Sequence, residues 1–184
     1  MARGGAAYAG PVTSKLLPLA AAAALLLTLS ACSSSPTVSP SSPAAAVDGE
    51  CAGVTVIVDA GDLAYADEVS SEACIETDEA IIAADAFAEA GVEMVGTTPY
   101  PDDIVCRVNG APAADEVLVA EDGTEYSESC ESMPAAFAYW SLWVKPAGGE
   151  WGYATEGAAT LSLEPGDSVE LLFTLNGEPA APTP

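Results

Sequence analysis

The chain has 184 residues, half of them apolar, and 28 acidic residues against four basic ones, which gives a formal net charge of −24. Nucleic acids are therefore excluded as partners, because their binding depends on Lys and Arg side chains that neutralise phosphates. The chain also contains no histidine. This removes the most common general base and metal ligand, and it disfavours an enzyme.

The N-terminus has the pattern of an export signal. Arg3 and Lys15 precede an apolar run over residues 16–29, and the run ends in Leu29-Ser30-Ala31-Cys32. A charged segment, an apolar segment and small residues before a cleavage point are typical of a secretory signal. A cysteine directly after that point resembles the lipobox of bacterial lipoproteins, which implies cleavage before Cys32 and its lipidation with a diacylglycerol. The alternative, a transmembrane helix, is disfavoured because the run is short and no basic cluster follows it.

The chain is expected to divide into four parts. Residues 1–31 are the predicted lipoprotein signal peptide, and residues 32–47 are the lipidated cysteine and a disordered tether of Ser, Pro and Ala. Residues 48–176 are predicted to form a single α+β domain, and residues 177–184 a disordered tail. These features predict a secreted protein that a lipid anchors at the extracytoplasmic face of the bacterial cell membrane.

Export also makes the protein more acidic, because Arg3 and Lys15 leave with the signal peptide. Only Arg107 and Lys145 then remain against all 28 acidic residues, which lie from Asp48 onward. Two explanations of this acidity remain open. The acidic side chains either keep the protein soluble, or suit it to a salty habitat in which their mutual repulsion is screened. Alternatively, they attract a cationic ligand or partner.

The first elements of the domain are two strands and a helix. The β-branched run over 54–58 predicts a buried strand, and a second short strand is expected near residues 73–75. Thr77 followed by two carboxylates predicts the start of a helix, with an apolar face that includes Phe87. Gly91 is placed where a left-handed residue ends a helix. This is the one helix that the sequence predicts convincingly.

Strands are expected along the rest of the domain. Asn109-Gly110, residues 121–123 and residues 165–167 predict turns. Alternating apolar residues from Val169 to Leu175 predict a strand with one buried face. The other expected strands are residues 92–95, 104–108, 117–119, 137–144 and 151–153. One helix packed on antiparallel sheets gives an α+β fold class.

The cysteines left after lipidation form an even set, which predicts two disulfides in an oxidising location: Cys51, Cys74, Cys106 and Cys130. A hairpin between the first two strands would favour pairing Cys51 with Cys74 and Cys106 with Cys130. A metal site is disfavoured, since the chain has no C-x-x-C spacing and no histidine. Calcium binding is disfavoured as well, because neither Asp59 and Asp62 nor Asp102 and Asp103 fit a calcium-loop pattern.

Aromatic residues are concentrated in 137–143 and 151–153, which contain all three tryptophans. On a strand, Phe137, Tyr139 and Trp143 point to one face, and Trp140, Leu142 and Val144 to the other. One face should fill the core. The other face is either covered or left as a platform for a flat apolar ligand or a protein. Aromatic rings stack on flat apolar ligands and are enriched at protein contacts.

The order of these features resembles a known family. The helix segment Asp85-Ala86-Phe87-Ala88-Glu89-Ala90-Gly91 and the strand Tyr139-Trp140-Ser141-Leu142-Trp143 are the most specific parts. Residues 105–110, 149–153 and 165–167 complete the pattern. Together they resemble the C-terminal β-domain of transcobalamin and intrinsic factor, in the form found in actinobacterial lipoproteins. In the vertebrate carriers this domain closes over one side of the corrin and a separate helical barrel covers the other. This sequence contains no such barrel, so the resemblance implies half of a corrin site.

Two functions follow as hypotheses. The first is a non-catalytic binding module that captures a hydrophobic small molecule, such as a cobalamin-type corrinoid, for a transporter or partner protein. Its predicted ligand or partner platform is Tyr139, Trp140, Trp143, Trp151 and Tyr153. The alternative is a cell-surface protein-interaction or structural module with no small-molecule ligand. An enzyme with paired carboxylates is disfavoured, because the acidic residues show no ordered pair.

Overall fold

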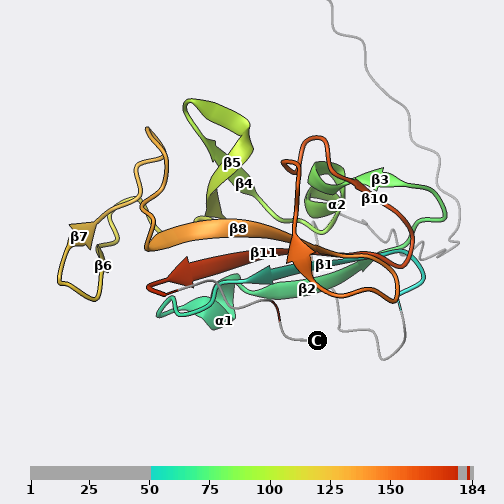
Figure 1. The fold of residues 1–184 in the computed structure, drawn as a ribbon, viewed down its shortest axis with the longest axis horizontal. Coiled ribbons are helices and arrows are strands. Elements are labelled where there is room, and N and C mark those ends of the chain that lie inside the picture. Colours follow the sequence, from blue (N-terminus) through green and yellow to red (C-terminus); the bar gives the residue numbers. More distant parts are fainter. Residues whose placement is uncertain (1–50, 178–181, 183–184) are drawn as a thin grey trace, which may run out of the picture. The chain divides into compact units, whose positions relative to one another are not determined.

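The structure is a computed structural model, and it describes residues 51–177 and 182 (Figure 1). The signal peptide, Cys32, the tether and most of the tail lie outside the described residues. No helix in the described part of the chain has the length and apolar character needed to cross a membrane. The described part is mixed α+β and is mostly sheet, which confirms the coarse fold class. The expectation of antiparallel sheets alone is wrong, because residues 54–59 pair parallel with residues 168–175.

A five-stranded sheet forms the centre of the domain, in the order β2-β1-β11-β8-β9. The first two strands form the expected antiparallel hairpin, and β11 pairs antiparallel with β8. The pairing of β1 with β11 is parallel and places Thr55 opposite Ser168. The sheet strands are β1 (Val54–Asp59), β2 (Ser71–Ile75), β8 (Ala138–Lys145), β9 (Gly152–Tyr153) and β11 (Ser168–Leu175).

Strand β11 differs from its sequence-based prediction. Every residue from Val169 to Thr174 is buried, so both faces of the strand are covered, although the alternating pattern predicted only one. Glu170 and Thr174, which the pattern assigned to the solvent, are buried with the rest. The position of β11 between β1 and β8 explains the difference, because strands in the middle of a sheet are covered more completely than edge strands.

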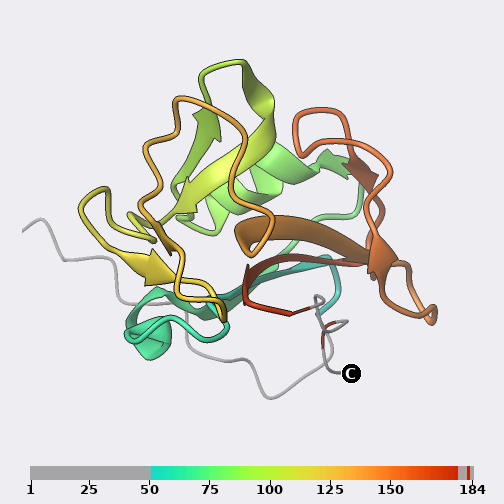
Figure 2. The ribbon, with the colours of Figure 1, turned by 60° about the vertical axis from the view of Figure 1, so that its left-hand side comes forward.

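One face of this sheet, which we call the first face, packs against one helix and two pairs of strands (Figures 1 and 2). These are α2 (Ala83–Glu89), the pair of β3 (Ile81–Ile82) with β10 (Ser162–Leu163), and the hairpin of β4 (Met94–Thr97) with β5 (Tyr100–Val108). The core lies between the two layers. Its fully buried side chains include Val56, Phe87, Leu163 and Leu171.

The predicted helix start at Thr77 is wrong, because α2 begins at Ala83. Thr77 forms a local turn instead, in which its Oγ1 accepts the Glu79 N–H at 3.2 Å. Residues Ile81–Ile82 then pair with β10, so tertiary pairing takes this segment out of the helix. The predicted end is correct, since Gly91 has a φ of +78° directly after the helix. A one-turn helix, α1 (Ala66–Val69), was not predicted.

Two disulfides hold the domain together. Cys51 is bonded to Cys74, which ties the start of β1 to β2. Cys106 on β5 is bonded to Cys130, which follows the small hairpin of β6 (Leu118–Val119) and β7 (Glu125–Tyr126). The bonds span 23 and 24 positions of sequence, and this is the pairing that the hairpin layout favoured.

Candidate functional site

The sheet register places Trp143 and Tyr153 on the face opposite α2, which we call the second face. Trp143 on β8 lies directly opposite Tyr153 on β9, and their rings stack with centroids 3.9 Å apart and planes at 26°. Trp143 is 5% exposed, whereas Tyr153 is 51% exposed. The stack therefore shields the tryptophan, while about half of the tyrosine stays exposed to solvent.

Trp151 precedes β9 and completes this group. The Lys145 Nζ lies 5.7 Å from the centre of the Trp151 ring, a cation–π contact. The Trp151 Nε1–H is buried and has no hydrogen-bond acceptor in the described part of the chain. A buried N–H without an acceptor is costly. We call Trp143, Trp151 and Tyr153 the aromatic cluster.

Trp140 belongs to the core and not to the aromatic cluster. Its ring packs edge-to-face on Phe173 on the first face, with centroids 5.2 Å apart, and it is 7% exposed. Its Nε1–H donates to the Ala111 carbonyl at 3.1 Å. The opposite orientations of Trp140 and Trp143 agree with the sequence prediction. Tyr139 is half-buried on β8, opposite Thr174, and lines a separate pocket. The structure thus brings three of the five predicted platform residues together.

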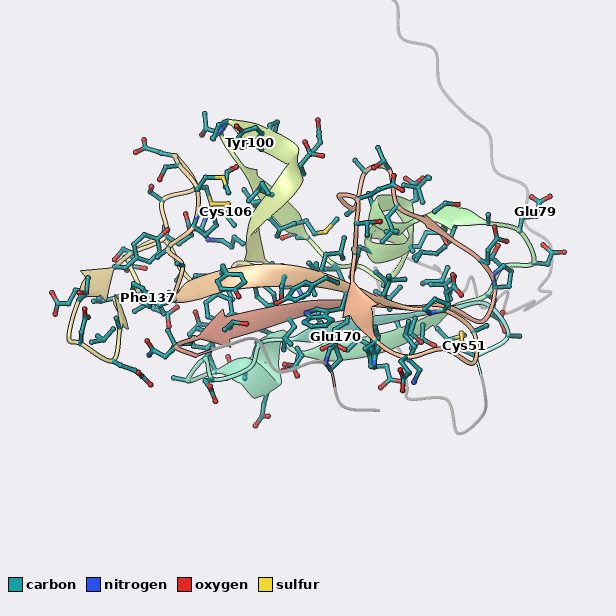
Figure 3. All side chains as sticks on the ribbon, viewed as in Figure 1. Cys51, Glu79, Tyr100, Cys106, Phe137 and Glu170 are labelled. Carbon is teal, nitrogen blue, oxygen red and sulfur yellow. A yellow bond between two sulfur atoms is a disulfide. The ribbon has the colours of Figure 1, made fainter. Side chains whose placement is uncertain are left out.

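Glu170 is a buried ionisable residue next to the aromatic cluster, and the sequence did not predict its burial. It lies on β11 opposite Trp143 and near the middle of the sheet (Figure 3), and it is 3% exposed. Burial raises the pKa of Glu170 to about 7, and the nearby Asp59 carboxylate adds to the shift. The alternation along β11 gave no signal for this residue, because it resembles an ordinary solvent-facing glutamate.

Two pockets flank Trp140 and share Ile104 of β5 as a second wall. One has a volume of about 360 Å³ and is lined by Asp103, Leu142 and Glu156. We call this the acidic pocket. The other, the apolar pocket, has a volume of about 380 Å³ and is lined by Tyr139 and a nearby loop. The loop residues are Met133, Pro134, Ala135 and Ala136.

The second disulfide lies in a group of buried polar residues. Sulfur atoms of Cys106 and Cys130 and a carboxylate oxygen of Glu128 lie within 4.8 Å of one another. The sulfurs are bonded to each other, and Glu128 accepts the Cys130 N–H at 2.6 Å and the Tyr126 hydroxyl at 2.5 Å. Arg107 donates to the Glu128 carbonyl at 2.7 Å. These bonds satisfy the group internally, so it has a structural role.

The acidic pairs considered for calcium also have local roles. Asp59 accepts the Gly61 N–H at 2.8 Å within a turn. Asp103 packs against Gly157, where a Cβ atom would come within 2.9 Å of its carboxylate oxygen. The glycine therefore allows the loop after β9 to approach β5 and to form one wall of the acidic pocket.

Comparison with known proteins identifies no relative. No family model matches the chain, no curated protein matches it, and no solved structure matches it. Function is therefore inferred from the chemistry of the aromatic cluster and the pockets.

Proposed function

We propose that the protein is a lipid-anchored, non-catalytic binding module outside the cell, and that a flat, hydrophobic small molecule stacks on Tyr153. The stack of Tyr153 on Trp143 carries this proposal, because half of the tyrosine side chain stays exposed. Aromatic rings prefer stacked neighbours, and a ligand ring on the open side would extend the stack outward. The module would then present its ligand to a transporter or a partner protein at the membrane.

A cobalamin-type corrinoid is the ligand class that we favour. The resemblance to the transcobalamin C-terminal domain supports it, and so does the flat shape of the macrocycle. The net charge of −24 disfavours anionic ligands and is compatible with neutral or cationic ones.

A catalytic role is not proposed, although one carboxyl has a pKa suited to proton transfer. Glu170 titrates near neutral pH, where a general acid or base works best. It is, however, 3% exposed and lines neither the acidic nor the apolar pocket. A substrate would therefore have no access to it.

The proposal is tested by titrating the purified lipoprotein with cyanocobalamin and following tryptophan fluorescence. We expect saturable quenching, because Trp143 and Trp151 lie in the aromatic cluster. Free N-acetyltryptophanamide, titrated in parallel, corrects for light absorbed by the ligand. Tyr153→Ala should weaken binding about tenfold, the effect of losing one stacked ring. The matched control is Tyr100→Ala, since Tyr100 on β5 is also 51% exposed.

Two results would contradict the proposal. One is the absence of any saturable change up to high micromolar ligand. The other is an equal loss of affinity in the Tyr153 and Tyr100 variants, which would show that quenching reports nonspecific adsorption.

A further inference from the structure

The acidic pocket borders the edge of β8 that faces away from β11. Residues 140–142 line it from β8, residues 103–105 from β5, and residues 153–158 from β9 and the loop that follows. Ser141 contributes its backbone to the pocket, because its side chain lies on the second face, where its Oγ accepts the Trp143 Nε1–H at 3.0 Å. The pocket therefore reaches the main chain of β8.

The Trp140 carbonyl is an unused acceptor on this edge. The Ala154 N–H donates to the Leu142 carbonyl at 3.0 Å, so Leu142 directs its carbonyl to the outer edge of β8. Alternate residues of an antiparallel strand point the same way, which directs the Trp140 carbonyl to that edge too. No hydrogen bond within the described residues ends on it. Because a carbonyl lies between its own residue and the next, this one is on the Ser141 side of Trp140, next to the acidic pocket.

Two carboxylates on the pocket wall are also without partners. Asp103 and Glu156 are exposed, and neither forms a hydrogen bond or an ion pair with another described residue. The two carboxylates come from neighbouring segments, because the Asp103 side chain lies against Gly157, the residue after Glu156. The pocket thus combines two free negative charges with one free carbonyl.

The cations of the domain do not neutralise this pocket. The described part of the chain has two basic side chains, Arg107 and Lys145. Arg107 donates to the Pro112 and Glu128 carbonyls, both at 2.7 Å, and the Lys145 Nζ lies over the Trp151 ring. A cation that balances the two pocket carboxylates therefore comes from outside the domain.

The three acceptors and the apolar walls select the kind of cation. An alkylammonium head is compact and carries three N–H donors, one for the Trp140 carbonyl and one for each carboxylate. The side chains of Ile104, Leu142 and Leu171 have no polar atom and offer contacts to a short carbon chain. Calcium fits less well, because it takes about six to eight oxygen ligands.

We propose that the acidic pocket binds a small primary amine in its protonated form. The Trp140 carbonyl and the carboxylates of Asp103 and Glu156 accept its N–H groups, and its carbon chain lies against the apolar walls. This site goes beyond the proposed corrinoid site. The two share only Tyr153, whose ring is stacked within the aromatic cluster on the second face.

The proposal is tested by amide NMR of the isotope-labelled lipoprotein in micelles of a non-ionic detergent, with three probes of equal chain length. n-Butylammonium has the charge and the donors, n-butyltrimethylammonium has the charge alone, and n-butanol lacks the charge. We expect n-butylammonium to bind at least about tenfold more tightly than the other two, because charged hydrogen bonds are lost in both. The amide nitrogen of Ser141, which shares its peptide group with the Trp140 carbonyl, should shift along the same binding curve. A titration of micelles without protein corrects for probe taken up by the detergent.

The carboxylates are tested by neutral variants of similar shape. Asp103→Asn combined with Glu156→Gln should weaken n-butylammonium about tenfold and leave n-butanol unchanged. The matched control is Glu121→Gln combined with Glu125→Gln, which removes two exposed carboxylates outside the pocket.

Four results would overturn the proposal. They are equal affinity for the three probes, no binding of n-butylammonium at millimolar concentrations, equal weakening in the two double variants, and displacement of n-butylammonium by micromolar calcium, which would identify a calcium site. Neither double variant alters the aromatic cluster, so cyanocobalamin quenching stays as in the wild type and the two proposals fail separately.

Discussion

Glu170 lies near the middle of the sheet, between Ile57 of β1 and Trp143 of β8. Its carboxyl is 3% exposed and close to Asp59, and both conditions favour the protonated form. The folded protein therefore holds a proton on this residue up to about pH 7, whereas the unfolded chain loses it near 4.5. By linkage, this residue makes the free energy of unfolding fall as pH rises through that interval.

Glu170→Gln should remove this pH dependence. Between about pH 5 and about pH 8, the wild type should lose about 2 kcal/mol of unfolding free energy more than the variant does. Urea unfolding at the two pH values measures this difference, and Glu72→Gln on β2, at the edge of the same sheet, is the exposed control. A variant that loses as much stability as the wild type would show that Glu170 is not the titrating group.

Gly157 lies where the loop after β9 comes close to Asp103 of β5. A Cβ atom there would come within 2.9 Å of the Asp103 carboxylate and 3.0 Å of its Cα. Gly157→Ala should therefore destabilise the domain by about 1–2 kcal/mol, because β5 and the loop must move apart. Gly152→Ala is the control, since its added Cβ would meet nothing within 4 Å. Equal urea midpoints for the two variants would contradict this account.

At the scale of elements, the sequence pattern predicted the strands better than it predicted how they pair. The β-branched run of β1 and the turn at Asn109-Gly110 depend on neighbouring residues alone, and both are present. The parallel pairing of β1 with β11 joins segments more than 100 positions apart. No local pattern encodes such a contact, and the burial of Glu170 is its consequence.

The helix start shows the same limit in a different way. Thr77 and its following carboxylates form a good capping pattern, yet β3 pairs with β10 and delays the helix to Ala83. For the same reason, the sequence predicted only part of the candidate site. The facing directions of Trp140 and Trp143 follow from strand periodicity, whereas their cover by Phe173 and Tyr153 depends on long-range packing.

Because Thr77 caps no helix, Thr77→Ala should cost less than about 0.5 kcal/mol of unfolding free energy, below the typical cost of losing an N-cap. Leu163→Ala on β10 is the contrasting variant, since Leu163 is fully buried. It should cost about 2–5 kcal/mol. Urea unfolding compares the two, and a Thr77 variant that loses more than about 1 kcal/mol would restore a capping role.

At the scale of the whole molecule, the two disulfides act on separate parts of the domain. Each closes a loop of similar length, and a loop of this size stabilises the fold by roughly 3 kcal/mol in the chain-entropy model. The paired substitution Cys51→Ser with Cys74→Ser should therefore lower the unfolding free energy by about that amount. A loss below about 1 kcal/mol in urea unfolding would show that the sheet alone holds this hairpin.

The central claim combines a lipid anchor at Cys32 with a ligand stacked on Tyr153. One measurement tests both: cells expressing the wild type, Cys32→Ser or Tyr153→Ala are given radiolabelled cyanocobalamin, and protein and label are counted in the membrane pellet and the supernatant. We predict that wild-type protein and label sediment together, that Cys32→Ser carries both into the supernatant, and that Tyr153→Ala sediments with less label than the wild type. Sedimentation of the Cys32 variant with the membrane, or equal label in the wild-type and Tyr153→Ala pellets, would contradict the account.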